Sequence, residues 1–307
     1  MPTQYHVSER DGYRSRKGGL YVKLKLGALS DYINIFTTAM SKKAWSSLNY
    51  VDLLSGPGEI YIEESRQYLD GSPILALNAD PKFDNLWFVE KVKVNFQPLE
   101  KRCSVIDINS RANCIHGDCN EKVTEIVETI DKLDQQYRME SRAPSLNLAF
   151  LDPDGCKTLQ WSTIERLASI KHMDLIINYS TSTVLRTIKL QSEADNVTVL
   201  DEFFGGYDWR DFYKDIVGRH GSNDHLLIGR KMLNFYKSNL KQLGYHFVFD
   251  DPSLEDFAIK NSKESHMYTL IGTGKHELAV RFWSKSFKGA FKRITEQPEL
   301  PGFVKSI

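Results

Sequence analysis

Acidic residues close four of the short apolar runs in this chain. They are Asp52, Glu90, Asp118 and Asp152. A carboxylate can accept hydrogen bonds from the amino and hydroxyl groups of a ligand, and it can also take up a proton. If the apolar runs are strands of one parallel sheet, their ends meet at one edge. The four carboxylates would then line a ligand site at that edge.

A glycine-containing loop follows the first of these carboxylates. Asp52 is followed after two leucines by Ser55, Gly56, Pro57 and Gly58. Glycine permits backbone conformations with positive φ and lets a ligand approach the main chain closely. The loop lacks both the dinucleotide fingerprint and the Walker lysine, so it suits a ligand without phosphates, such as S-adenosylmethionine (SAM). A plain tight turn after a strand explains the same residues equally well.

The next two strand ends extend this expected cofactor site. Glu90 can accept both hydroxyls of a ribose, as acidic residues do in dinucleotide folds. Asp118 could bind the adenine amino group, and Cys119 beside it is predicted to belong to the same cofactor site. The structural alternatives are a solvated surface glutamate at Glu90 and a helix N-cap at Asp118, because Glu121 follows three residues later.

The fourth strand ends in Asp152, Pro153, Asp154 and Gly155. A carboxylate here would point into the crevice beside a methyl donor. Methyl transfer needs an aligned acceptor lone pair and a group that holds the acceptor and takes its proton. Asp152, Pro153 and Asp154 are therefore the predicted catalytic residues, and an Asp-Pro turn is the structural alternative.

Strands and helices alternate through the middle of the chain. This rhythm predicts an α/β fold of the Rossmann-like class I methyltransferase type: a doubly wound, mostly parallel sheet with an antiparallel C-terminal strand and a helical insertion. The expected strands cover residues 49–54, 85–90, 113–116, 146–152 and 173–179, and the expected helices cover residues 91–103, 121–138 and 161–170.

Four segments are expected along the chain. Residues 1–48 form a helical entry segment, with apolar positions at helical spacing over 17–43. Residues 49–180 form the SAM-binding core. Residues 181–244 form a helical insertion or lid that contains an aromatic run, and residues 245–307 return to the core with a closing antiparallel pair of strands.

The balance of charged residues limits which binding partners the sequence predicts. Lys plus Arg and Asp plus Glu both number 40 among 307 residues, so the chain has no overall charge that would attract nucleic acid. Local contacts to a nucleic acid substrate are possible at Tyr207, Trp209 and Arg210, or at the basic stretch 285–293. Packing of the lid and a solvated helix face are the structural alternatives.

The cysteines and the N-terminus predict an ordinary cytoplasmic protein. Cys103, Cys114, Cys119 and Cys156 show no CxxC spacing, so we expect reduced thiols and no metal site. Residues 1–16 lack an apolar signal-peptide core, and no apolar run is long enough to span a membrane.

Six segments of the chain, spread in order along nearly its whole length, carry a resemblance to a known family: residues 23–36, 50–58, 71–73, 148–155, 233–240 and 268–271. In these motifs the chain resembles the three-Cys-motif partner protein (TcmP) family. The resemblance implies a class I methyltransferase-like fold, a bacterial or archaeal cytoplasmic setting, and a partner protein with a three-cysteine motif, iron–sulfur or radical-SAM-like, encoded nearby.

One position departs from the family pattern. Members typically read Asp-Pro-Phe-Gly where this chain has Asp154, and an aromatic side chain there could stack on a flipped base, whereas aspartate cannot. The leading hypothesis is a SAM-dependent methyltransferase acting on nitrogen or oxygen. The alternatives are a catalytically degenerate SAM-binding module serving the partner protein, and a magnesium-dependent nuclease using Asp52, Glu90 and Asp152.

Overall fold

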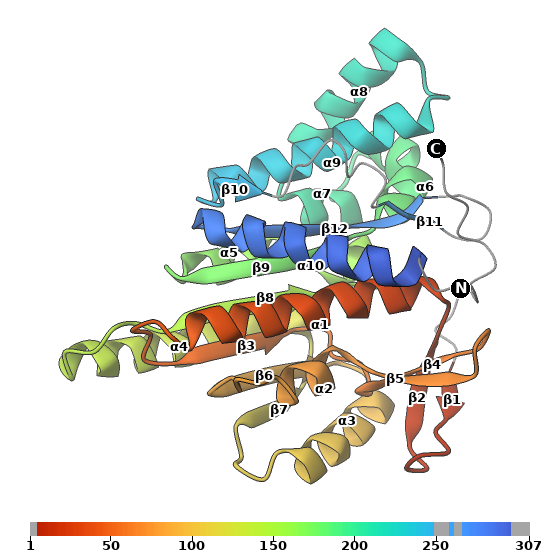
Figure 1. Ribbon diagram of the computed structural model, residues 1–307. Helices are drawn as coiled ribbons and strands as arrows, with labels where there is room; N and C mark the ends of the chain where they lie inside the picture. The colour runs from red at the N-terminus through yellow and green to blue at the C-terminus, as the bar shows by residue number, and fades with distance from the viewer. Residues whose placement is uncertain (1–4, 249–257, 261–265, 296–307) are drawn as a thin grey trace.

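The computed structural model describes residues 5–248, 258–260 and 266–295, and its central feature is a large sheet (Figure 1). This eight-stranded sheet has the order β10-β12-β9-β8-β3-β6-β7, and β11 pairs with β12. The strands are β3 (Leu48–Asp52), β6 (Asn85–Glu90), β7 (Ala112–His116), β8 (Leu146–Leu151), β9 (Met173–Tyr179), β10 (Phe247–Val248), β11 (Ala258–Lys260) and β12 (His266–Gly274).

Strand directions identify the fold. β7, β6, β3, β8 and β9 run parallel, whereas β12 is antiparallel to β9 and β10 is antiparallel to β12. The chain passes from β3 outward to β7 and returns to β8 on the other side of β3, so a topological switch point lies between β3 and β8. The sheet is the doubly wound, Rossmann-like methyltransferase type with an antiparallel C-terminal strand, which confirms the predicted fold class.

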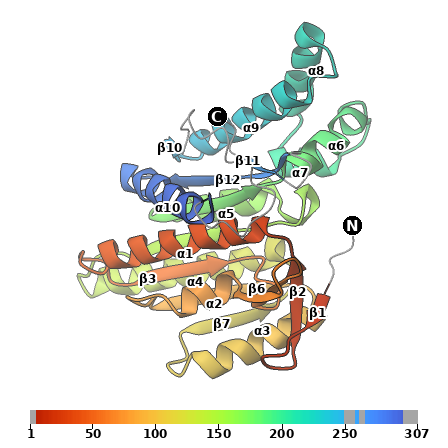
Figure 2. The same cartoon turned by 45° about the vertical axis from the view of Figure 1, so that its right-hand side comes forward.

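Both faces of this sheet are covered, which explains why its central strands are apolar throughout. Alternate residues point to opposite sides: Tyr50 and Phe88 face one core, whereas Val51 and Val89 face the other. The first core is closed by α1 (Tyr21–Met40), α2 (Ser72–Leu77), α3 (Lys93–Ile106) and α10 (Glu277–Thr295). The second is closed by α4 (Cys119–Met139), α5 (Trp161–Ser169) and the helices that follow β9 (Figure 2).

A second, four-stranded sheet stands beside the carboxyl ends of the large one. Its order is β1-β2-β4-β5, formed by β1 (Tyr5–Val7), β2 (Arg14–Gly18), β4 (Glu59–Ile62) and β5 (Gln67–Asp70). The N-terminal segment was expected to be helical, but its described part, residues 5–48, begins with strands β1 and β2, and α1 is the helix in that part. The glycine loop after β3 leads into β4 of this sheet.

A buried arginine of α3 joins the second sheet to the glycine loop. Arg102 donates from Nη1 to the carbonyl oxygens of Arg14 at 3.0 Å and of Pro57 at 2.6 Å. Its Nε and Nη2 atoms donate to both carboxylate oxygens of Asp11 at 2.7 and 3.0 Å, and Nη2 lies 3.4 Å from Glu59. The Arg102 side chain, only 8% exposed, thus connects the N-terminal hairpin formed by β1 and β2 to the glycine loop and to β4.

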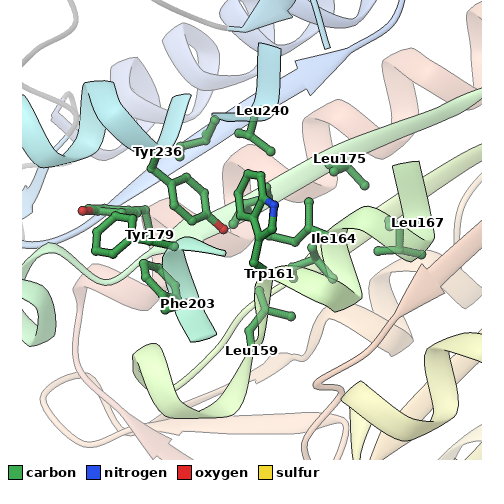
Figure 3. Packing of buried hydrophobic residues seen from close by; sticks show 14 of the residues in the cluster. Leu159, Trp161, Ile164, Leu167, Leu175, Tyr179, Phe203, Tyr236 and Leu240 are labelled. Carbon is green, nitrogen blue, oxygen red and sulfur yellow. The ribbon is translucent and has the colours of Figure 1, made fainter. Parts of the chain in front are cut away.

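Four helices fill residues 181–242, where an insertion was expected. They are α6 (Thr181–Ser192), α7 (Val199–Phe204), α8 (Asp208–His220) and α9 (His225–Gln242). Figure 3 shows how aromatic rings join α9 to α7 and α5: Tyr236 of α9 stacks on Phe203 of α7 at 5.0 Å and meets Trp161 of α5 edge-on at 5.2 Å. These ring pairs are interior packing.

The aromatic run expected as a nucleic acid contact is structural at two of its three named residues. Trp209 is fully buried, and its Nε1 donates to Asp201 at 2.9 Å. Arg210 pairs with the same carboxylate at 2.8 Å from Nε. Only Tyr207 is exposed. The packing alternative therefore holds for Trp209 and Arg210.

None of the helices in the described parts of the chain is long and apolar enough to cross a membrane.

Replacement of Arg102 should show how strongly the second sheet depends on it. Arg102→Met leaves Asp11 and the Pro57 carbonyl without a cationic donor and leaves Glu59 with Arg10 as its remaining cation, so we expect the free energy of unfolding to fall by about 3 kcal/mol. Urea denaturation measures this loss. Arg142→Met, which removes an exposed ion pair to Glu140, is the matched control and should cost less than about 1 kcal/mol. Equal losses in the two variants would contradict the role of Arg102.

Candidate functional site

The predicted carboxylates meet at the carboxyl edge of the large sheet. Asp52 and Glu90 are the last residues of β3 and β6, Asp152 directly follows β8, and Asp118 lies two residues beyond β7. Asp52 and Asp152 stand on either side of the switch point and interact electrostatically. Ligands of open α/β sheets bind in the crevice at this position.

Hydrogen bonds shape the glycine loop between β3 and β4. Ser55 donates from its amide to the Val89 carbonyl at 2.9 Å and from Oγ to the Asp52 carbonyl at 2.9 Å. Gly56 and Gly58 have φ values of +62° and +84°, in the left-handed region that favours glycine. A Cβ at Gly56 would meet nothing within 4 Å, so this part of the loop is open to a ligand.

Gly71 holds the other end of the loop in place. Its amide donates to the Gly58 carbonyl at 2.8 Å. A Cβ added at Gly71 would lie 3.0 Å from both the carbonyl carbon and oxygen of Gly58, so any other residue would have to push the loop backbone aside by a few tenths of an ångström. Backbone packing against the loop therefore favours glycine at position 71.

Asp52 is fully buried at the base of the loop. Its Oδ1 accepts from the Leu54 amide at 3.2 Å, whereas Oδ2 has no hydrogen-bond partner. Burial raises the pKa of Asp52 to about 7, and the neighbouring Asp152 charge adds to the rise, although hydroxyls of Ser72 and Ser55 and the Leu54 amide oppose it. The orphan oxygen is ready to accept a hydrogen bond from a ligand.

Glu90 faces the same loop from β6. It is buried, and its Oε1 accepts from the Val92 amide at 2.6 Å. Burial raises its pKa, against hydrogen bonds from the Val92 and Gly56 amides and from Asn95 that lower it. The surface alternative for Glu90 is therefore wrong, because the carboxylate lies under the loop.

Asp118 caps α4, as the structural alternative proposed. Its Oδ1 accepts from the Asn120 amide at 2.8 Å, and its Oδ2 pairs with Lys91 at 2.7 Å. Burial would raise its pKa, but Lys91 and Asn120 together lower it. The neighbouring Cys119 donates its thiol to the Thr158 carbonyl at 3.1 Å, and burial raises the pKa of that thiol to about 12. The polar atoms of both side chains are thus already engaged in the protein.

Asp152 is held by two residues that lie outside the predicted site, Lys25 and Asn178. Lys25 of α1 donates to Oδ2 at 2.6 Å, and Asn178 of β9 donates to Oδ1 at 2.7 Å. The Lys25 and Asp152 side chains are only 8% and 14% exposed. Burial alone would raise the pKa of Asp152, but the charges of Lys25 and Arg16 and these hydrogen bonds outweigh it and lower the pKa. Asp152 is therefore ionised at neutral pH.

Asp154 forms an ion pair with Arg16 of β2. The pair is partly solvated, since Asp154 is 51% exposed and Arg16 is 31% exposed. It ties the N-terminal hairpin to the turn after β8, while Pro153 between the two aspartates is buried. Asp154, which stands where the TcmP-like pattern has phenylalanine, therefore has an ion-pair partner in this chain.

Lys25 and Asn178 were not predicted as site residues, but the sequence around each one contains a signal for its role. Lys25 shares a helix face with Leu29, Tyr32 and Phe36, at spacings of four, three and four residues, all of them buried. A lysine on an apolar helix face requires a buried counter-charge. Asn178 likewise follows three apolar residues, Leu175 to Ile177, and lies one residue before the end of its strand.

Several buried polar atoms around this edge lack partners. They include Asp52 Oδ2, Asn178 Oδ1 and the Tyr50 and Tyr268 hydroxyls. Tyr50 interacts electrostatically with both Asp52 and Asp152, and Tyr268 with Asp152. Unmet acceptors of this kind suit a ligand that brings ammonium and hydroxyl groups, as SAM does. Among the residues that the structure describes, no three His, Cys, Asp or Glu side chains gather as they would around a metal ion.

No family model matches this chain, and no curated protein matches it in sequence. Solved structures similar to it include protein LPL1258 from Legionella pneumophila, of the DUF519 family model, with 14% identity and a TM-score of 0.40 over 54% of this chain and 73% of that one. A Staphylococcus aureus protein assigned as a caffeoyl-CoA O-methyltransferase has 11% identity and a TM-score of 0.38 over 80% and 82%. The Escherichia coli protein yhhF, assigned as a methyltransferase, has 11% identity and a TM-score of 0.30 over 48% and 67%.

Asp52→Asn should make stability less dependent on pH. A folded-state pKa raised to about 7 means that the wild type loses stability as pH rises from about 4 to 7, by on the order of 4 kcal/mol. The variant lacks this loss, so its stability relative to wild type should rise over that window and stay constant above it. Denaturant unfolding of both proteins at pH values of about 4, 6 and 8 measures this difference in stability. A pH-independent difference would show that Asp52 is not buried in its acidic form.

Lys25→Met and Asp154→Asn should differ sharply in stability. The first leaves the buried Asp152 charge unpaired and should cost about 3 kcal/mol or more near neutral pH. The second breaks a half-exposed pair and should cost less than about 1 kcal/mol. Because the pKa of Asp152 is lowered in the folded protein, the deficit of Lys25→Met should shrink as acid protonates Asp152. Thermal melts across acidic and neutral pH test both statements; similar costs would contradict the ion-pair assignment.

Proposed function

We propose that this protein binds SAM at the carboxyl edge of the large sheet and transfers its methyl group to a nitrogen or oxygen acceptor. The observation that carries the proposal is the buried, unpartnered carboxylate oxygen of Asp52, which lies at the switch point below an open glycine loop. The methyltransferase-type strand order and the TcmP-like motifs support it.

Three parts of the edge have roles in this proposal. Asp52 accepts from the ammonium of the amino-acid end of SAM, and the backbone of residues 55–58 packs beside it. Glu90 accepts from the ribose hydroxyls, as acidic residues at this strand end do in related sheets. Asp118 and Cys119 line the adenine end through their backbone and shape, because their side-chain polar atoms are engaged elsewhere.

Asp152 would orient the acceptor without acting as a strong base. SAM supplies a methyl group on a sulfonium, which a nitrogen or oxygen lone pair accepts. Both carboxylate oxygens of Asp152 already accept hydrogen bonds, and its lowered pKa makes it a weak proton acceptor at neutral pH. The rate would therefore come mainly from proximity and alignment at this edge.

A second candidate is a non-catalytic SAM-binding module that serves a three-cysteine partner protein. The engagement of Asp152 by Lys25 and Asn178, and of Asp154 by Arg16, favours it, because no carboxylate of the turn is left free for an acceptor. The nuclease alternative has less support, because Asp52, Glu90 and Asp152 do not form a metal-binding cluster among the described residues.

Calorimetry with SAM and S-adenosylhomocysteine tests the cofactor proposal. Glu90→Gln should weaken binding by roughly tenfold to a hundredfold, because hydrogen bonds to a charged acceptor contribute about 1.5–3 kcal/mol. Glu100→Gln, an exposed change on α3, is the matched control and should bind like the wild type. Failure of the wild type to bind either compound would refute both candidate functions.

Transfer of labelled methyl from SAM to DNA, RNA, protein and small-molecule fractions separates the two candidates. Label in one fraction that disappears with Asp152→Asn supports the methyltransferase. SAM binding without label in any fraction supports the non-catalytic module.

A further inference from the structure

The exposed face of α10 carries a stripe of positive charge. Arg281, Lys285, Lys288 and Lys292 follow one another at spacings of four, three and four residues, and all are exposed. Such spacing places them on one side of a helix, over about 16 Å of its length. We call these four residues the basic stripe. The stripe is concentrated charge in a chain whose overall charge is zero.

The sequence of α10 contains few acidic residues. Glu277 is the one acidic residue in the sequence of the helix, at its first turn, and its carboxylate lies 3.8 Å from Arg281. The fifth cation, Arg293, points toward α1 and pairs with Asp31 at 2.6 Å. Arg293 thus ties α10 to α1.

The apolar face of α10 is used inside the protein. Trp283, Phe287 and Ala290 are each about 1% exposed and pack in the core between α1 and the sheet. A helix that lies on a membrane surface needs its apolar face for the lipid. Because that face is buried here, the stripe can act only through charge, as a surface does that binds a polyanion.

The stripe leads toward the candidate site. Helix α10 lies along α1 and runs antiparallel to it, as Figures 1 and 2 show. Its C-terminal half lies beside the first half of α1: a Cβ at Gly27 would be 3.6 Å from Ala290. Two residues before Gly27, Lys25 holds Asp152 at the sheet edge. The Lys292 end of the stripe is thus the end nearer the site.

We propose that the basic stripe of α10 binds the phosphate backbone of a nucleic acid strand and leads that strand to the carboxyl edge. The contact is to phosphates alone, so binding is independent of base sequence. That the bound strand is also the methyl acceptor rests on the proposed function; the binding itself does not. The proposal places the nucleic acid surface on α10, away from the aromatic run of α7 and α8, whose Trp209 and Arg210 are engaged inside the protein.

Fluorescence anisotropy with a labelled single-stranded RNA of mixed sequence, and with a DNA strand of the same sequence, tests the stripe. The variant with R281Q, K285Q, K288Q and K292Q combined should lose about tenfold or more in affinity for both. The slope of log K against log salt should fall by about 3, as expected when four phosphate contacts are lost. A control variant makes the same charge change at exposed cations elsewhere: Lys132→Gln, Arg138→Gln, Lys214→Gln and Lys241→Gln.

Several outcomes would overturn the proposal. They are absence of binding by the wild type, equal losses in the stripe and control variants, strong dependence on base sequence, and equal competition by polyglutamate. Tighter binding to vesicles of phosphatidylcholine and phosphatidylserine than to RNA would overturn it in favour of a membrane surface. SAM calorimetry on the stripe variant should match the wild type, so a failure here is distinguishable from a failure of the cofactor proposal. If the combined variant melts early, the pairs R281Q/K285Q and K288Q/K292Q are measured separately.

Discussion

Burial of the Asp152 charge is the constraint around which the carboxyl edge is built. A carboxylate at the end of a central strand costs several kcal/mol unless a counter-charge and hydrogen bonds satisfy it. Lys25 and Asn178 supply both, at 2.6 and 2.7 Å. Because Lys25 lies in the first turns of α1, this requirement also fixes where α1 begins over the sheet, and the preceding hairpin is brought close enough for Arg16 to pair with Asp154.

The pKa values of the two carboxylates at this switch point are consequently shifted in opposite directions. Asp152, beside two cations, has a lowered pKa, whereas Asp52, which no ion pair neutralises, has a pKa raised to about 7 by burial. Environments that push the pKa values of neighbouring acids apart are common where each has a separate task. Here the difference separates a carboxylate that is already satisfied by the protein from one that still has a free oxygen. That distinction is the reason that the proposed ligand site is placed on the Asp52 side of the edge.

The sequence predicted the large sheet well and the small one not at all. Runs such as 146–151 are apolar throughout because both faces of the strand are buried, and that pattern is visible without a structure. The strands of the second sheet are only three to five residues long and carry many charged side chains. Their pairing depends on Arg102, which reaches them from a distant helix, so no local pattern could reveal it.

By itself, the sequence determined which carboxylates end the strands, because a strand of fixed direction delivers its last residue to a known edge. It also determined the glycine loop, since positive φ at Gly56 and Gly58 favours that residue type. Tertiary structure alone decided what each carboxylate touches. Lys25 lies 127 positions from Asp152 in the sequence, and their contact exists only because α1 packs across the end of β8. Partners of buried charges are chosen by packing between distant segments, which sequence spacing does not encode.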